Sequence, residues 1–375
     1  MFNGGIPIGR FFGITVTLHW SWFIIFFLVT WMLATEYFPS VEEYQEWSTA
    51  TRWVISLVTS ILFFSSVLAH ELAHSLVAKA SGLKVSAITL FIFGGVSQLT
   101  EEPKSPGMEF RMAIAGPGTS LVIGGACWGI YFATQQPVSP VTGMAFWLGY
   151  MNVFLAAFNL IPGFPLDGGR VLRSLLWWRS RNLRKSTRIA SVIGRGFGYV
   201  FIFGGIALVF TDMWSLGLSL LLIGWILENA AVGSYRQVAI QDILRGHKVS
   251  EVMTRDCQVV PSTLTVEQLV NDHVLTSGRR CFPVVDYGRA LGLVTVHNVR
   301  VVERKLWPKR TVREIMTPID RMKQVRPDDD LSSVMHLLTE EDVNQVPVVE
   351  DNNIIGMVAR DSLLSFIHIR GELGL

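Results

Sequence analysis

The sequence predicts a polytopic α-helical membrane domain of about six transmembrane helices, followed by a soluble α/β module built from a tandem repeat. Half of the 375 residues are hydrophobic and only 17% are charged, and the mean hydropathy is positive, at +0.39. Long apolar stretches fill the first 232 residues, whereas the chain becomes charged from about residue 246 and then repeats itself once. This balance is typical of a membrane protein that carries a soluble part.

Six apolar stretches account for the expected crossings, since a helix needs about 20 apolar residues to span a bilayer. They cover residues 20–34, 53–78, 112–133, 144–161, 189–210 and 214–232. The first is short at its apolar centre, and Leu18 and Trp20 can extend it. We therefore expect a membrane domain over residues 1–232, a linking helix over 233–248 and the soluble module over 249–375.

Residues His70-Glu71-Leu72-Ala73-His74 lie inside the second stretch. On a helix, His70 and His74 lie four residues apart on one face, where both imidazoles can bind one zinc ion. Glu71 stands beside them, placed to take a proton from an attacking water. Ionisable side chains at membrane depth are costly, and they indicate function. The motif therefore predicts zinc-dependent hydrolysis within the membrane.

A third metal donor is required, because a catalytic zinc site usually has three protein ligands. Asp167 is the best candidate, since it follows the fourth stretch in the segment NLIPGFPLDGGR, residues 159–170. The prolines and glycines of this segment cannot all continue a regular helix. Broken backbone at membrane depth is tolerated only against protein or a water-filled cavity. A carboxylate there suits a hydrated metal site.

The two motifs together, with Gly116-Pro117 in the third stretch, resemble the site-2 protease family of intramembrane zinc metalloproteases over roughly residues 8–232. The resemblance implies one Zn²⁺ per chain, held by His70, His74 and Asp167. It also implies that Glu71 is the general base. Asn159 would then orient the substrate or stabilise the oxyanion.

The substrates of that family are transmembrane helices of membrane-tethered regulatory proteins, so the resemblance implies such a partner beside membrane lipid. A helix hides its carbonyl groups in its own hydrogen bonds and must unwind before water can attack. The edge of a strand offers replacement bonds by β-augmentation. Residues 90–99 (LFIFGGVSQL), with Gly94 and Gly95 at their centre, are the segment expected to supply that edge.

Charge sets the predicted orientation. The segment after the fourth stretch holds seven basic residues and no acid: Arg170, Arg173, Arg179, Arg181, Arg184, Lys185 and Arg188. The loop after the first stretch holds four acids against one cation: Glu36, Glu42, Glu43, Glu46 and Arg52. The positive-inside rule places the basic segment in the cytoplasm. Six crossings of the plasma membrane then leave both termini and the soluble module there. We interpret the basic run as an interfacial helix on anionic lipid.

Two further observations limit the partners and the compartment. The cysteines Cys127, Cys257 and Cys281 show no paired spacing, so a disulfide framework is not expected and the soluble part suits a reducing compartment. The formal net charge of +2 gives no indication of nucleic acid as a partner.

The soluble part repeats with a shift of 63 to 66 residues. The repeated pairs are Val252-Met253-Thr254 with Ile315-Met316-Thr317, Pro261 with Pro327, Pro283-Val284-Val285 with Pro347-Val348-Val349, and Gly292 with Gly356. Each copy predicts a helix followed by two apolar strands around a turn. The copies, at about 249–303 and 311–369, are similar to a tandem pair of cystathionine-β-synthase-type (CBS) domains.

The CBS resemblance implies a regulatory module that dimerises and binds an adenosine nucleotide. Gly292, Thr295 and Gly356 match parts of the nucleotide motif, but Asn298 stands where an Asp is expected, and neither copy is complete. A dimerisation or docking module without nucleotide is an equal alternative.

A CBS-gated transporter or channel is the alternative function, because intramembrane His, Glu and Asp can form an ion path. We find no repeat between the two halves of the membrane region, although many transporters have one.

Overall fold

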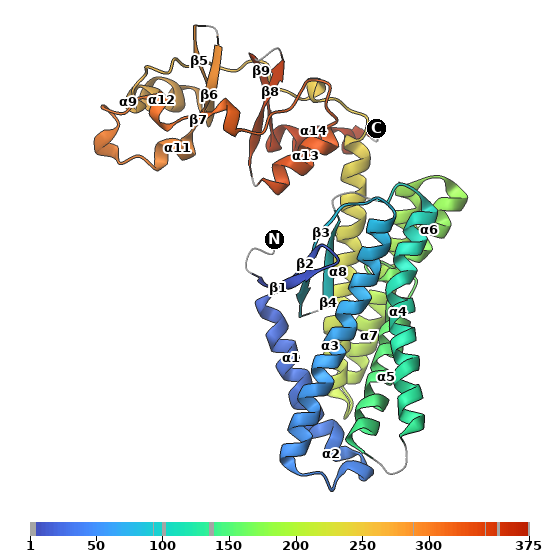
Figure 1. Cartoon of the computed structure of the whole chain (residues 1–375). Helices are drawn as coiled ribbons and strands as arrows, with labels where there is room; N and C mark the ends of the chain where they lie inside the picture. The colour runs from blue at the N-terminus through green and yellow to red at the C-terminus, as the bar shows by residue number, and fades with distance from the viewer. Residues whose placement is uncertain are drawn as a thin grey trace. The chain divides into compact units, whose positions relative to one another are not determined.

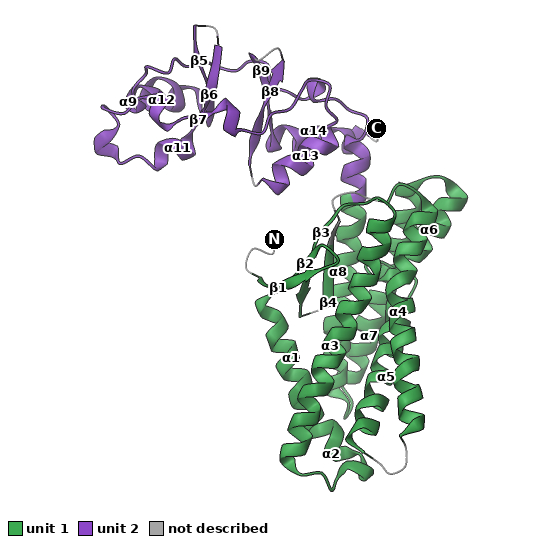
Figure 2. Ribbon diagram, viewed as in Figure 1, with its two compact units in different colours: residues 1–237 green, residues 238–375 purple. Residues whose placement is uncertain are grey.

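The computed structural model describes residues 5–92, 94–99, 103–134, 139–287, 289–341, 343–350 and 353–373. The chain divides into two compact units, Met1–Gln237 and Val238–Leu375 (Figure 2). The first unit holds the long helices and an N-terminal sheet, and the second holds the repeat. Helix α8, Trp214–Leu244, runs across the boundary, so the linking helix expected over 233–248 is partly a continuation of the last long helix.

Six helices among the described residues are long and apolar enough to span a membrane, which confirms the predicted fold class (Figure 1). They are Trp20–Ser40, Thr49–Ala80 (α3), Pro106–Ala133 (α4), Pro140–Asn159 (α5), Leu183–Val209 (α7) and Trp214–Leu244 (α8). The first of these comprises α1 (Trp20–Met32), a π-helical turn (Leu33–Tyr37) and α2 (Phe38–Ser40), and a 3₁₀ turn follows at Glu42–Tyr44.

Serine side chains begin three of these helices. The hydroxyls of Ser48, Ser105 and Ser139 accept backbone N–H groups in the first turns of α3, α4 and α5, which satisfies donors that a helix start leaves unpaired. Pro106 and Pro140 occupy the first helical position, where no N–H is needed. The helix starts therefore follow from capping chemistry that hydropathy alone does not detect.

A shorter helix, α6 (Asp167–Ser180), follows α5 after a turn and ends at Arg181 in the left-handed conformation. It lies at the end of the helix bundle opposite α2 (Figure 1). It packs against α4 and α7. Arg173 on α6 is only 4% exposed, so the interpretation of the whole basic run as a lipid-facing helix is wrong at this residue.

Four strands form one sheet in the order β1-β2-β3-β4. The strands are β1 (Ile6–Phe11), β2 (Ile14–Leu18), β3 (Val85–Phe91) and β4 (Gly94–Leu99). β2 and β3 are parallel, and the outer pairs are antiparallel. Alternate residues of β2 are buried, and they form a core with Ile88 and Leu90 against Leu68 and Leu72 of α3. The sheet therefore packs on the helix that carries the histidines, with β4 at its edge.

The second unit contains a three-stranded sheet, β5-β6-β7, and a two-stranded sheet, β8-β9. Its strands are β5 (Cys281–Asp286), β6 (Arg289–Thr295), β7 (Thr317–Pro318), β8 (Gln345–Glu350) and β9 (Asn353–Ala359). Its α-helices are α9 (Val266–Gln268), α10 (Leu275–Ser277), α11 (Val296–Arg300), α12 (Val312–Ile315), α13 (Leu331–Glu340) and α14 (Arg360–Leu373). A π-helical turn, Leu269–Val274, joins α9 to α10, and 3₁₀ turns occur at Val249–Glu251, Arg304–Leu306 and Ile319–Arg321.

The two copies of the repeat exchange their leading segments. Thr254, which leads the first copy, pairs with Met357 on β9 of the second copy. Thr317, which leads the second copy, pairs with Leu293 on β6 of the first copy. This reciprocal pairing makes one body of the two copies.

Candidate metal centre

Helix α3 presents His70 and His74 on one face, four residues apart. Both side chains are largely buried, at 4% and 14% exposure. Their Nε2 atoms lie 3.2 Å apart. The helical spacing therefore places both imidazoles on the same side of α3, with their Nε2 atoms close together.

Asp167, the first residue of α6, completes the cluster from 93 residues further along the chain. Its Oδ2 atom lies 3.1 Å from the Nε2 atom of each histidine. Donors that bind one tetrahedral zinc at about 2.0–2.1 Å are about 3.3 Å from one another. Among the described residues, these three form the group of His, Cys, Asp and Glu side chains that could hold a metal ion.

The turn between α5 and α6 places Asp167 at this point. A Cβ atom on Gly168 would lie 2.3 Å from the carbonyl oxygens of Leu160 and Ile161, and one on Gly169 would lie 2.4 Å from the backbone of Gly163. Real Cβ atoms essentially never come closer than 3.0 Å to such atoms. The two glycines of the Asp-Gly-Gly sequence therefore let α6 begin directly against the end of α5.

Helix α4 supplies the second hydrogen bond of each histidine. The Nδ1 atom of His74 is 2.6 Å from the carbonyl oxygen of Met112. Because a carbonyl only accepts, Nδ1 carries the proton in the neutral ring, and Nε2 is left with the lone pair that a metal requires. The Nδ1 atom of His70 is 2.9 Å from the hydroxyl of Ser120. Such outer partners orient metal-binding imidazoles.

Gly116 keeps the space in front of the histidines open. A Cβ atom at this position would lie 2.2 Å from Nε2 of His74 and 2.6 Å from Nε2 of His70. The donor set, the fixed tautomer of His74 and this side-chain-free space all fit a zinc ion. The residues at this site therefore fit the Zn²⁺ ion that the sequence resemblance implies.

Glu71 lies where strand β4 approaches α3. A Cβ atom on Gly95 would lie 2.3 Å from Cγ of Glu71, so the strand comes this close only because residue 95 is glycine. The hydroxyls of Ser75 and Ser97 are 2.9 Å apart and tie β4 to α3 one turn further along. The predicted general base and the predicted strand edge therefore lie side by side.

The remaining predicted residues have local partners. Asn159 ends α5 and donates from Nδ2 to the carbonyl oxygen of Leu155. Gly94 begins β4 at a φ of +123°, a conformation that favours glycine.

The candidate nucleotide residues of the CBS pair have structural roles. A Cβ atom on Gly292 would lie 2.3 Å from the carbonyl oxygen of Thr317, and one on Gly356 would lie 3.1 Å from that of Thr254. Both glycines therefore permit the exchanged strand pairings. Thr295 caps α11 together with Asn298.

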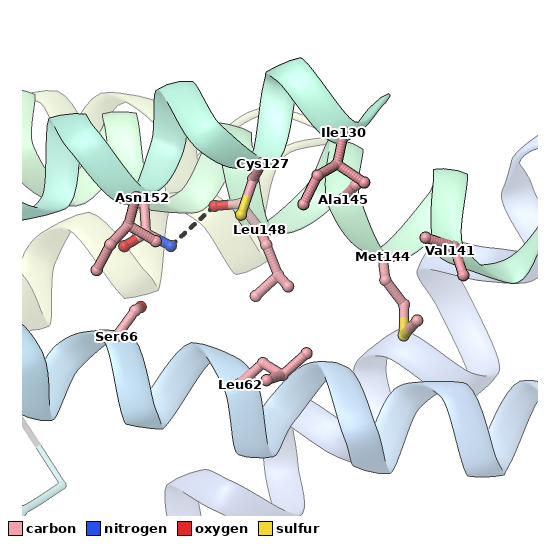
Figure 3. Close-up of a pocket in the computed structure, with 10 residues that line it drawn as sticks. Leu62, Ser66, Cys127, Ile130, Val141, Met144, Ala145, Leu148 and Asn152 are labelled. Atoms are coloured by element: carbon pink, nitrogen blue, oxygen red, sulfur yellow. Dashed lines mark hydrogen bonds between the residues drawn. The ribbon is translucent and has the colours of Figure 1, made fainter. Parts of the chain in front are cut away.

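A separate cavity of about 300 Å³ lies between α3, α4 and α5 (Figure 3). Its lining is mostly apolar, with Ser66 and Asn152 as the polar side chains. The lining residues are Leu62, Ser66, Ile123, Cys127, Ile130, Val141, Met144, Ala145, Leu148 and Asn152. Asn152 is fully buried and donates from Nδ2 to the carbonyl oxygen of Leu148, whereas its Oδ1 atom has no hydrogen-bond partner. The three clustered donors do not line this cavity.

Sequence reasoning included Gly116-Pro117 of α4 in the family resemblance but missed the roles of Glu109, Met112 and Ser120. Glu109, Met112, Gly116 and Ser120 follow one another at spacings of three, four and four residues, which places them on one face of the helix. Glu109 forms a buried ion pair with Arg173 of α6. The spacing was visible in the sequence, but the partners on α3 and α6 were not.

The fold and the three-donor cluster are those of a polytopic membrane protein with a candidate zinc site. The chain also matches known families. Residues 58–142 and 133–203 match the Peptidase family M50, and residues 249–303 and 312–369 match the CBS domain. The "Putative zinc metalloprotease sll0528" of Synechocystis is 34% identical over 96% of this chain and 95% of its own length. The chain belongs to the Peptidase family M50, the site-2 proteases.

Two further relatives come from Methanocaldococcus jannaschii. The "Zinc metalloprotease MJ0392" is 29% identical over 99% of both chains. A solved site-2 protease is 28% identical and covers 62% of this chain and 95% of its own, with a TM-score of 0.44. The relatives named as metalloproteases confirm the predicted zinc metalloprotease and its CBS pair.

Proposed function

We propose that this protein is an intramembrane endopeptidase that hydrolyses a peptide bond within or near a transmembrane helix of a membrane-tethered regulatory protein. The convergence of His70 Nε2, His74 Nε2 and Asp167 Oδ2 carries this proposal. Two of the donors come from a helix long enough to span a membrane, and the third is the first residue of α6, which follows another such helix after a turn. A substrate helix in the same bilayer can reach such a site.

The chain's own residues divide the chemistry. His70, His74 and Asp167 would hold the zinc, which supplies a Lewis acid that activates water at neutral pH and stabilises developing negative charge. Glu71 takes the proton from the attacking water and returns it to the leaving amine. The position of Glu71, one residue after His70 on α3, supports this role.

Strand β4 is proposed to hold the unwound substrate. It lies at the edge of the sheet in the order β1-β2-β3-β4, and Gly95 brings it against Glu71. A substrate strand added to this edge would replace the hydrogen bonds of the substrate helix and present its carbonyl beside the general base. Gly94 and Gly95 are proposed as substrate-binding residues on this basis. Asn159 is proposed to orient the carbonyl or stabilise the oxyanion.

The metal centre is proposed to lie toward the cytoplasmic leaflet. Seven basic residues occupy positions 170 to 188, in α6, at its C-cap Arg181 and at the start of α7. Under the positive-inside rule this end of the bundle faces the cytoplasm. Both termini and the CBS pair then lie on that side of the plasma membrane.

The CBS pair is proposed to regulate the protease as a homodimer contact and as a receptor for an adenosine nucleotide. The proposed nucleotide binding rests on the sequence motif alone. The contacts of its residues in the structure are structural, since Gly292 and Gly356 pack against backbone and Thr295 caps α11. Titration of the full-length protein with ATP and AMP tests the nucleotide. Sedimentation in detergent tests the dimer.

The catalytic proposal is tested on full-length protein purified in detergent, with zinc measured by elemental analysis and cleavage measured on candidate transmembrane substrates. We expect Glu71→Gln to keep zinc and lose cleavage, and Asp167→Ala to lose zinc. Asp212→Ala, which changes an exposed acid beyond α7, is the matched control. Turnover by the Glu71 variant, or full zinc in the Asp167 variant, would contradict the assignment.

A further inference from the structure

A buried ion pair joins the two helices that shape the metal centre. Glu109 lies in the first turn of α4 and is 1% exposed, and Arg173 lies on α6 and is 4% exposed. Both Nε and Nη2 of the guanidinium contact Oε1 of the carboxylate. Because a buried charge is costly without a partner, this contact offsets part of the cost of burying both side chains.

Both ends of this ion pair lead directly to the candidate ligands. On α4, Glu109 shares its face with Met112, which accepts the hydrogen bond from His74, and with Ser120, which contacts His70. On α6, Arg173 lies six residues after Asp167. The pair therefore ties the helix that orients both histidines to the helix that begins with the carboxylate ligand.

The guanidinium of Arg173 also contacts the turn before Asp167. Its Cζ atom lies 5.2 Å from the centroid of the Phe164 ring, and Phe164 is itself 5% exposed. One turn before Arg173, Gly169 presses against the backbone of Gly163 and Phe164. Arg173 thus joins α4, the turn and α6 at one point.

The distance along α6 between Arg173 and Asp167 means that a small tilt of the helix at Arg173 displaces the carboxylate of Asp167. Six residues of helix span about 9 Å, so a tilt of α6 by about 10° at Arg173 moves Asp167 by about 1.5 Å. Metal–ligand distances tolerate only about 0.2 Å. The ion pair restrains this tilt in addition to the packing of α6 on α4 and α7.

We propose that Glu109 and Arg173 are positioning residues that hold Asp167 in register with His70 and His74. This inference rests on the proposed function, because it requires these three residues to bind zinc. Arginine suits the role better than lysine, since its planar group binds through two nitrogens and stacks on Phe164.

The test measures the zinc dissociation constant by competition with a chelator, together with the unfolding temperature, on the full-length protein in detergent. Arg173→Met and Arg173→Lys are each expected to weaken zinc binding about 10-fold to 100-fold, the range typical of outer partners of a metal site. In the double variant Glu109→Leu with Arg173→Met, apolar packing replaces the ion pair. We expect this variant to regain the unfolding temperature but not the zinc affinity.

The ion pair between Arg195 and Glu228 provides the matched control. It joins α7 to α8, with a distance of 3.2 Å from Nε to Oε1. Arg195→Met with Glu228→Leu should leave zinc binding unchanged.

The outcomes separate the positioning role from general stability. Zinc affinity within twofold of the wild type in the double variant or in Arg173→Lys would overturn the positioning role, even if Arg173→Met fails to fold. A wild-type protein that binds no zinc would instead refute the proposed metal site.

Discussion

Replacement of Gly116 by alanine tests the open space at the metal centre, because it adds a single methyl group in front of the two histidines. In a helix interior, alanine is normally more favourable than glycine by about 0.5–1 kcal/mol. The added Cβ atom of residue 116 would nevertheless lie 2.2 Å from Nε2 of His74 and 2.6 Å from Nε2 of His70. The variant therefore combines a favourable effect on helix stability with an unfavourable contact between the new Cβ atom and the two histidines.

The size of the effect follows from the distances. An ordinary contact of a Cβ atom is 3.4–4 Å, so Nε2 of His74 would have to retreat by more than an ångström. Zinc coordination tolerates about 0.2 Å. We expect zinc affinity to fall at least about 100-fold, which corresponds to about 2.8 kcal/mol.

Two glycines on the same helix serve as controls. A Cβ atom on Gly118 or on Gly125 would meet nothing within 4 Å, so Gly118→Ala and Gly125→Ala should keep zinc and leave the unfolding temperature equal or higher. Residue 116 precedes Pro117, which itself disfavours a helical alanine. Zinc affinity is therefore measured on protein shown to be folded. Wild-type zinc affinity in folded Gly116→Ala would refute the reasoning, as would a comparable loss in either control.

Three further predictions concern other parts of the chain. Gly95→Ala should lower kcat at least about tenfold while zinc is retained, because the added Cβ would lie 2.3 Å from Cγ of Glu71; unchanged kcat in a cleavage assay would contradict the close approach. Asn152→Leu should raise stability by about 1 kcal/mol, since it removes a buried carbonyl oxygen without a partner; a lower unfolding temperature would argue against this. Burial raises the pKa of the Cys281 thiol to about 12, so its alkylation rate should rise about tenfold per pH unit through pH 9 and beyond. In single-cysteine variants, a rate for Cys281 that levels off below pH 9 would count against this burial.

The sequence predicts the ligands because each has a local signature. His70 and His74 are one helical turn apart within an apolar stretch, and this spacing can be recognised in the sequence without knowledge of the tertiary structure. Asp167 follows a run of prolines and glycines that no transmembrane helix could continue. The capping serines that begin α3 and α4 are local in the same sense.

Arg173 shows where local reasoning ends. It stands in a run of seven cations, and such a run is typical of a helix on anionic lipid. Its partner Glu109 lies 64 residues away, and only the packing of α4 on α6 brings the two together. The exchanged strand pairings of the CBS copies are unpredictable for the same reason, since the repeat is visible in the sequence but its crossing contacts are not.

The outer partners on α4 were hidden for a further physical reason. An imidazole needs only a hydrogen-bond acceptor at Nδ1 and free space at Nε2. Here Met112 provides a backbone carbonyl, Gly116 provides the absence of a side chain, and Ser120 provides a hydroxyl. None of these carries a charge, so each costs little in a bilayer and leaves the hydropathy of the helix almost unchanged. A membrane helix can therefore carry most of the orienting chemistry of a metal site while its composition indicates only that it spans the membrane.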